Sequence, residues 1–256
     1  MIKTRFLTLP LRCGRIFDRS GNAIREKDLP LAIHDVGKLV KFVEGNFANK
    51  NIDIAVTDAS LCNEPGHSLS LRSNLFELLT LFRDRSSEDD LRVFYFAGHG
   101  STVDGELYLI PPDYKQGLLA ETAIPLSLVM KAIQSSKGQT VVILDCCRQN
   151  SQIEVFPSLQ NFSVLLDSNT HVLLGCSQGQ ACHEIEAPRI KGGVFTHSLL
   201  QCFSECTRDD SLQDIYSRLI SLQADLMQEL VGNRTQKAQL YSLSASDFFP
   251  ATLYSR

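Results

Sequence analysis

The sequence lacks the features that would mark a nucleic-acid-binding or membrane protein. Its 256 residues include 25 Lys and Arg against 29 Asp and Glu, and no cluster of basic residues stands out. Because phosphate binding needs a concentrated positive surface, we expect that nucleic acid is not a partner. No apolar run approaches the roughly 20 residues that cross a bilayer, and the first residues are too polar for a signal peptide. We therefore expect a cytoplasmic protein without membrane contact.

Paired metal or redox motifs are also missing. The eight cysteines have no regular spacing and form no C-x-x-C pair, which in a chain of this length favours reduced thiols over a disulfide framework. Cys176, Cys182 and His183 are a possible ligand combination, but no paired spacing supports zinc. A glycine-rich phosphate loop is absent as well. We expect no cofactor and no bound metal.

Strand-like and helix-like segments alternate along the chain, with no repeat or Pro- and Ser-rich linker. This alternation predicts an α/β fold of one domain over 1–256, with helices covering a mostly parallel sheet. A Ser211-x-x-Asp214 capping box opens the last helix. The expected strands are 4–9, 51–57, 91–97, 105–110, 140–145, 171–175 and 237–243, and the expected helices are 35–47, 71–83, 125–136, 194–204 and 211–230.

Two apolar strands end in residues suited to nucleophilic chemistry. F-Y-F-A-G-H-G at 94–100 leads to His99, and V-V-I-L-D-C-C-R at 141–148 leads to Cys147. Catalytic groups gather outside the carboxyl ends of parallel strands, so adjacent strands would bring these two residues together. A thiol is a weak nucleophile at neutral pH, and an imidazole can take its proton and later protonate the leaving amine. Each residue alone is more often a loop or core residue; the pair carries the prediction.

This joint pattern resembles the caspase-like cysteine peptidases, and within them the metacaspases and their bacterial relatives. That family pairs a His in a strand-end (Y/F)-x-G-H-G with a Cys in a later strand-end D-x-C. The resemblance spans about residues 30–245 and includes G-V-F-T-H-S-L-L at 193–200. It implies a six-stranded, mostly parallel sheet with helices on both faces, and a cysteine endopeptidase that uses His99 and Cys147.

The adjacent Cys146 leaves a choice of nucleophile. In the family the Asp stands two residues before the reactive Cys, and Asp145 then selects Cys147. Strand alternation agrees that only one of the two thiols can face a cleft, so we expect Cys146 to pack inward. The backbone amides of Gly100 and Cys147 are the expected donors to the oxyanion.

The resemblance also bears on specificity, because caspases cut after Asp whereas metacaspases cut after Arg or Lys with the help of acidic residues. By that resemblance Asp35 and Asp145 would bind the basic side chain of a protein or peptide substrate through charge-assisted hydrogen bonds. Both have structural interpretations too, Asp35 as a helix N-cap and Asp145 as a cap on neighbouring amides. Ala97 departs from the family, in which many metacaspases carry Ser at this position.

Regulation is less well defined by the sequence. Residues 149–188 contain no Lys or Arg, so an enzyme specific for basic residues cannot cut itself there. The flexible-looking segment with Arg189 and Lys191 is the favoured self-cleavage site, and an activating protease or an upstream sensor is the alternative. Only Asp113 and Glu154 are candidate calcium ligands, which argues against a strict calcium requirement. We expect a monomer.

Three functions remain open at this point. A cysteine endopeptidase is favoured, with the role in cell death or defence signalling that the resemblance implies. A catalytically silent caspase-like adaptor is the first alternative, although both dyad residues are present. An unrelated α/β binding or redox protein is the second, and the missing C-x-x-C and phosphate loop count against it.

Overall fold

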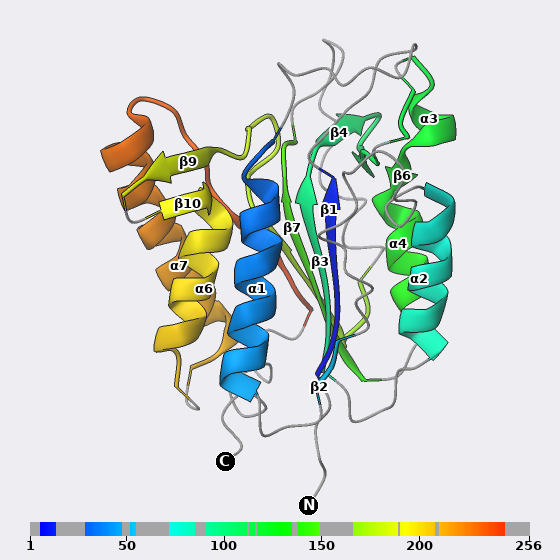
Figure 1. Cartoon of the computed structure of the whole chain (residues 1–256), viewed down its shortest axis with the longest axis horizontal. Helices are drawn as coiled ribbons and strands as arrows, with labels where there is room; N and C mark the ends of the chain where they lie inside the picture. Colours follow the sequence, from blue (N-terminus) through cyan, green and yellow to red (C-terminus); the bar gives the residue numbers. More distant parts are fainter. Residues whose placement is uncertain are drawn as a thin grey trace, which may run out of the picture.

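A six-stranded sheet with strand order β11-β8-β7-β3-β1-β2 forms the centre of the molecule (Figure 1). In this computed structural model the described residues are 6–13, 29–47, 52–54, 72–84, 91–111, 113–115, 117–134, 138–148, 166–188, 190–207 and 210–243. The strands are β1 (Phe6–Cys13), β2 (Ile52–Ile54), β3 (Leu91–Gly98), β7 (Gln139–Cys146), β8 (Thr170–Leu174) and β11 (Gln239–Tyr241). Neighbours pair in parallel except at β11, which is antiparallel to β8. The mostly parallel six-stranded sheet is therefore confirmed.

Helices cover both faces of this sheet (Figure 1). One face packs against α1 (Ala32–Phe47), α6 (Val194–Glu205) and α7 (Leu212–Leu226), and the other against α2 (Arg72–Asp84) and α4 (Leu126–Gln134). Strand alternation explains how one strand serves both cores, because successive side chains point to opposite faces. In β3, Tyr95 belongs to the core with α1 and Phe96 to the core with α2.

Smaller elements lie beyond the central sheet. A three-stranded sheet has the order β4-β5-β6, and a separate hairpin pairs β9 with β10. A two-residue Asp104–Gly105 turn, a sequence typical of tight hairpins, joins β4 to β5. The elements are β4 (Gly100–Val103), β5 (Glu106–Leu109), α3 (Leu119–Thr122), β6 (Ile124–Pro125), β9 (Glu184–Ala187), β10 (Ile190–Gly193) and the π-helical turn η3 (Met227–Val231) that continues α7.

The expected helices and strands are present, with small shifts at their ends. The first strand is described from Phe6 and extends to Cys13, beyond its expected end, and the 51–57 strand is described only over 52–54. Ser211 caps α7 in a complete capping box with Asp214, as predicted. Among the helices of the described segments, none has the length and apolar character needed to cross a bilayer.

One expectation was wrong: the segment around Lys191 is not a flexible loop. Lys191 lies in β10, opposite Glu186 of β9, and the Nζ–Oε1 distance is 2.9 Å. Four-residue strands carry too little periodicity to be recognised in the sequence. Arg189, the other candidate self-cleavage residue, lies outside the described residues.

Candidate active site

The ends of β3 and β7 bring His99 and Cys147 to the same edge of the sheet. In this parallel pair Gly98 lies opposite Cys146, and His99 and Cys147 are the residues that follow. The carbonyl of His99 accepts a hydrogen bond of 3.0 Å from the amide of Ile110, which fixes the backbone at the start of β4. The two residues thus leave neighbouring strands at corresponding positions.

Glycine at position 100 is required by the closeness of these two chain segments. A Cβ atom at Gly100 would lie 2.5 Å from the carbonyl oxygen of Cys147 and 2.9 Å from the Sγ of Cys146. No real Cβ approaches a backbone oxygen so closely, so any side chain would push the segment after His99 away from Cys147. The G-H-G motif therefore has a packing reason in addition to any catalytic one.

The two adjacent cysteines point in different directions, as strand alternation predicted. Cys146 is 1% exposed and packs in the core beneath α2 and α4. Cys147 lines a pocket on the other side, where its Sγ lies 3.9 Å from the carbonyl oxygen of Cys182. Burial raises the pKa of both thiols, that of Cys146 well above its usual range. Of these two thiols, only that of Cys147 lines the pocket.

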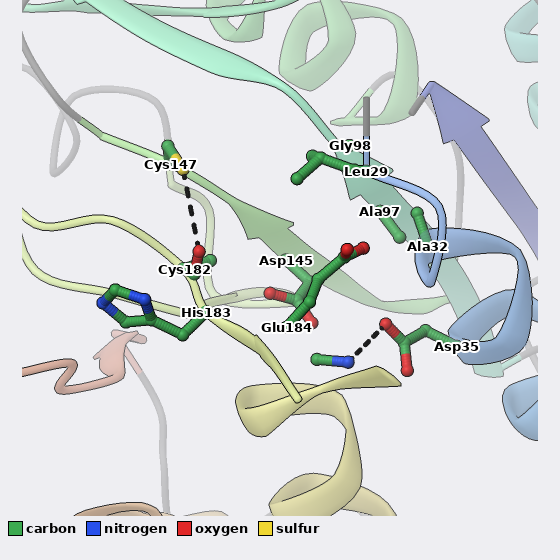
Figure 2. Close-up of a pocket in the computed structure, with 11 residues that line it drawn as sticks. Leu29, Ala32, Asp35, Ala97, Gly98, Asp145, Cys147, Cys182, His183 and Glu184 are labelled. Atoms are coloured by element: carbon green, nitrogen blue, oxygen red, sulfur yellow. Dashed lines mark hydrogen bonds between the residues drawn. The ribbon is translucent and has the colours of Figure 1, made fainter. Parts of the chain in front are cut away.

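Three carboxylates from three separate elements meet in this pocket (Figure 2). Asp35 comes from the first turn of α1, Asp145 from the end of β7 and Glu184 from the start of β9. The structure therefore places both expected acidic residues in the same pocket as Cys147 and adds Glu184. The full lining is Leu29, Ala32, Asp35, Ala97, Gly98, Asp145, Cys147, Cys182, His183, Glu184 and Gly193.

Asp35 is bonded to the hairpin and also forms an ion pair within its own helix. Its Oδ2 accepts a hydrogen bond of 2.7 Å from the amide of Gly193, and its Oδ1 lies 3.6 Å from the Nζ of Lys38. Because α1 begins at Ala32, Asp35 lies inside the first turn. The helix N-cap interpretation of Asp35 is wrong, since its bonded partner belongs to β10.

Asp145 is held at the beginning of α6. Its Oδ2 accepts a 2.7 Å hydrogen bond from the Thr196 hydroxyl, which is in turn 2.7 Å from the hydroxyl of Tyr95. The Thr196 backbone amide also contributes a bond that stabilises the ionised carboxylate. Thr196 lies 51 residues from Asp145 in the sequence, so this bond is not a cap on amides near Asp145 in the chain, and the same carboxylate lines the pocket.

Gly193 allows the two aspartates to lie on either side of one peptide. A Cβ atom there would lie 2.4 Å from the Oδ2 of Asp145 and 3.1 Å from the Oδ2 of Asp35. Even alanine would displace a carboxylate from the pocket. G-V-F-T-H-S-L-L therefore supplies the glycine between the carboxylates and, at Thr196, a donor to one of them.

Burial dominates the electrostatics of the pocket. It raises the pKa of Asp35 to about 8, with further repulsion from Asp145, and raises the pKa of Glu184 to about 7. The pKa of Asp145 is raised by burial as well, although the Thr196 and Cys182 side chains oppose the shift. Burial and mutual repulsion oppose the ionisation of all three carboxyl groups. A cation bound in the pocket would favour their ionised forms.

Sequence reasoning missed Glu184 because no strand was recognised at its position. The alternation in H-E-I-E at 183–186 was the available signal, since it predicts that Glu184 and Glu186 share one side of a short strand. In the structure Glu184 reaches the start of α1, where its Oε2 accepts a 3.4 Å hydrogen bond from the amide of Leu31. That contact places it beside the helix that carries Asp35.

The candidate metal ligands have other roles where they are described. Both oxygens of Asp113 accept from the Arg72 amide, at 3.2 and 3.4 Å, at the start of α2. Glu154 lies outside the described residues. The thiols of Cys176 and Cys182 both lie near the carbonyl oxygen of Cys146, at 3.4 and 3.2 Å. Within the described part of the chain, no three His, Cys, Asp or Glu side chains are arranged to hold a metal.

Comparison with known proteins agrees with this geometry. A family model of the caspase domain matches residues 67–250, a span that includes both His99 and Cys147. The chain is also 30% identical over 114 residues to a protein of Dictyostelium discoideum named paracaspase. That match covers 44% of this chain and 26% of the relative, so the chain spans about a quarter of that protein's length. Because the family model covers well over half of the sequence, this chain belongs to the caspase-like family of cysteine peptidases.

Proposed function

We propose that this chain is a cysteine endopeptidase that cleaves protein or peptide substrates after Arg or Lys. The observation that carries the proposal is the pocket that Cys147 lines together with three carboxyl groups, those of Asp35, Asp145 and Glu184. A guanidinium or ammonium group supplies the hydrogen-bond donors and positive charge that such a pocket favours, whereas an acidic side chain would be repelled. Ala97 offers no hydroxyl in the pocket, so the carboxylates would carry the specificity.

Cys147 is the proposed nucleophile and His99 the proposed general base. Burial raises the pKa of Cys147, so its resting form is the thiol and it needs a base. His99 would take the Sγ proton as sulfur attacks the peptide carbonyl carbon, and would then give that proton to the leaving amine. A water molecule would then attack the acyl carbon and lose a proton to His99. The C–S bond would break to release the new carboxylic acid, and His99 would return its proton to the sulfur of Cys147.

The backbone amides of Gly100 and Cys147 are the proposed donors to the oxyanion. Both belong to the segments that follow β3 and β7, and these lie in direct contact. Donors fixed by a sheet need no reorganisation as negative charge develops on the carbonyl oxygen. The close approach that Gly100 permits supports this assignment.

The direct test is an assay of the wild type and Cys147→Ala on fluorogenic peptides ending in Arg, Lys or Asp, with calcium and with chelator. We expect cleavage after Arg and Lys by the wild type and none above background by Cys147→Ala. Cleavage after Asp would keep the peptidase but remove the acidic specificity pocket. Cleavage in neither condition would favour a form that needs an activator, or the non-catalytic adaptor.

A second assay identifies the base, because two histidines lie near Cys147. His183 lines the pocket, and His99 follows β3 beside the Cys147 segment. We expect His99→Ala to lower kcat by at least about a hundredfold, and His183→Ala by less than about tenfold. The reverse order would transfer the role of general base to His183.

A further inference from the structure

The pocket wall that carries Cys182 and His183 belongs to a loop with no regular structure of its own, and Glu184 begins β9 directly after this loop. Residues 175–183 join β8 to β9 and contain neither helix nor strand. Side chains on such a connection are placed reliably only when other parts of the protein support the loop. The support of this loop therefore contributes to the position of Glu184, together with the pairing of Glu184 with Gly193 in the β9–β10 hairpin.

The side chain of Gln236 bridges the two ends of this loop. Its Nε2 donates to the carbonyl oxygen of Gly175 at 2.9 Å, and its Oε1 accepts from the amide of His183 at 2.8 Å. Gln236 is 4% exposed, so these bonds are largely shielded from water. One carboxamide thus bonds the backbone at Gly175, the first residue of the loop, and at His183, the residue directly before Glu184. A neighbouring strand would bond the backbone in the same way.

A second buried carboxamide fixes the segment that carries Gln236. Gln223 of α7 is 0% exposed, donates to the same Gly175 carbonyl at 2.8 Å and accepts from the amide of Ala238 at 2.7 Å. Each carboxamide uses its nitrogen and its oxygen on different partners, so neither can be turned over without losing both bonds. The loop is therefore tied to α7 and to the segment that enters β11.

The middle of the loop is attached separately to the residue after Cys147. The amide of Arg148 donates to the Gln180 carbonyl at 3.0 Å, and the amide of Gly179 donates to the Arg148 carbonyl at 3.0 Å. These are backbone bonds and do not involve the Gln236 side chain. The His183 carbonyl accepts a further bond of 2.9 Å from the Val194 amide. Loss of the Gln236 side chain should therefore loosen the His183 amide, while the bonds to Val194 and Arg148 remain.

We infer that Gln236 is a positioning residue of the specificity pocket, which acts by holding the His183 amide and thereby placing Glu184 against the basic side chain of a substrate. Gln236 is not among the residues that line the pocket, so its effect must pass through the loop. The inference rests on the proposed function, because it assumes that the three carboxylates bind a cationic group. It adds a residue outside the pocket to the determinants of specificity.

The experiment compares Gln236→Met with Gln228→Met, which changes an exposed glutamine of η3. We expect Gln236→Met to raise KM for an Arg-ended peptide roughly tenfold, with kcat changed by less than about threefold. The Kd of agmatine, a small guanidinium compound, should rise in parallel, and the His183 amide should exchange its hydrogen with solvent faster. Gln228→Met should match the wild type in all four measurements.

A conservative variant separates positioning from a general loss of stability. In Gln236→Glu the carboxylate can still accept from the His183 amide, but it can donate to Gly175 only when protonated. The ratio of its KM to the wild-type KM should therefore decrease as the pH is lowered. This variant also provides the test if Gln236→Met does not fold.

Two sets of outcomes distinguish this inference from the proposed function. If folded Gln236→Met has the wild-type KM and agmatine Kd, or if the Gln236→Glu ratio is independent of pH, the inference is overturned. If the wild type binds agmatine but cleaves no peptide, the peptidase proposal fails. The agmatine Kd values of the wild type and Gln236→Met then still test the positioning role of Gln236. If the wild type neither binds agmatine nor cleaves, both are overturned.

Discussion

The two faces of the central sheet differ in what they bury at its carboxyl edge. Beneath α2 and α4, β3 and β7 present Phe96, Leu144 and Cys146 to an apolar core. Beneath α1 and α6 the same strands present the hydroxyl of Tyr95 and the carboxylate of Asp145, joined through Thr196. The candidate site therefore lies on one face of the sheet, because successive side chains of a strand point to opposite faces.

The end of β7 contains this division within three consecutive residues. Asp145 and Cys147 line the pocket, while Cys146 between them is buried on the opposite side. Substitutions at neighbouring positions should therefore separate into those that change cleavage and those that change stability. Four pairs of variants test whether the two faces are independent.

The largest contrast is expected between the two cysteines. Cys147→Ala removes the proposed nucleophile and should lower kcat by at least about 10³-fold. Cys146→Ala should leave kcat/KM within about threefold of wild type and lower the free energy of unfolding by about 1–2 kcal/mol, since it removes a buried sulfur. Steady-state kinetics and urea unfolding measure the two effects. Loss of activity in a folded Cys146→Ala would show that the faces are not independent.

The next contrast is between Asp145 and Leu144, which lie side by side in β7 and face opposite cores. Asp145→Asn removes a carboxylate from the pocket and should lower kcat/KM for Arg-ended peptides roughly a hundredfold, because a buried charge on the substrate loses a partner. Leu144→Ala should cost about 2–5 kcal/mol of stability with normal cleavage per folded molecule. An Asp145→Asn enzyme with unchanged kcat/KM would remove Asp145 from the specificity pocket.

Much of the fold could be predicted because its long elements have clear periodicity. The continuous apolar runs that became β3 and β7 marked strands buried on both faces, and the spacing of Val36, Leu39 and Val40 marked α1. The β9–β10 hairpin was missed, since the H-E-I-E alternation of β9 is too short to stand out and the Gly-Gly pair of β10 is typical of loops. Its strands are fixed by tertiary contacts, including the Gly193 amide bonded to Asp35.

The candidate site was predicted only where residues follow recognisable strands. Cys147 and Asp145 could be read from the end of β7, and the inward packing of Cys146 followed from alternation. Glu184 and the Gln236 carboxamide could not, because their roles depend on which loops the tertiary structure brings together. Asp35 was placed by family resemblance, and its bond to Gly193 joins residues 158 positions apart in the sequence.

The third contrast concerns pH, because the pocket carboxyls hold protons that the unfolded chain releases. The pKa of Asp35 is about 8 in the folded protein against an ordinary value of 3.8. The folded state therefore binds more protons between these values, and the free energy of unfolding should fall as the pH rises from about 4 to about 8. Asn cannot release this proton, so Asp35→Asn should lose less stability over that range.

Urea unfolding at about pH 5 and about pH 8 checks the sign of this effect. A suitable comparison is Asp84→Asn, since Asp84 is an exposed carboxylate at the end of α2 on the other face of the sheet. Its pH dependence should follow that of the wild type. Equal pH dependence in wild type and Asp35→Asn would mean that Asp35 is already ionised near neutral pH.

The smallest contrast is between two buried threonines on opposite faces. The Thr196 hydroxyl bonds both Asp145 and Tyr95, whereas the Thr140 hydroxyl in β7 has no partner among the described residues. Thr196→Val should lower the free energy of unfolding by about 1–3 kcal/mol and raise KM a few-fold, because Tyr95 and Asp145 each lose a bond. Thr140→Val exchanges an unpaired hydroxyl for a methyl group, so it should be neutral or stabilising by up to about 1 kcal/mol. Urea unfolding measures the stability of both variants, and KM for an Arg-ended peptide measures their substrate binding. An equal loss of stability in the two variants would mean that the hydrogen bonds from Tyr95 through Thr196 to Asp145 give Asp145 no support beyond ordinary packing.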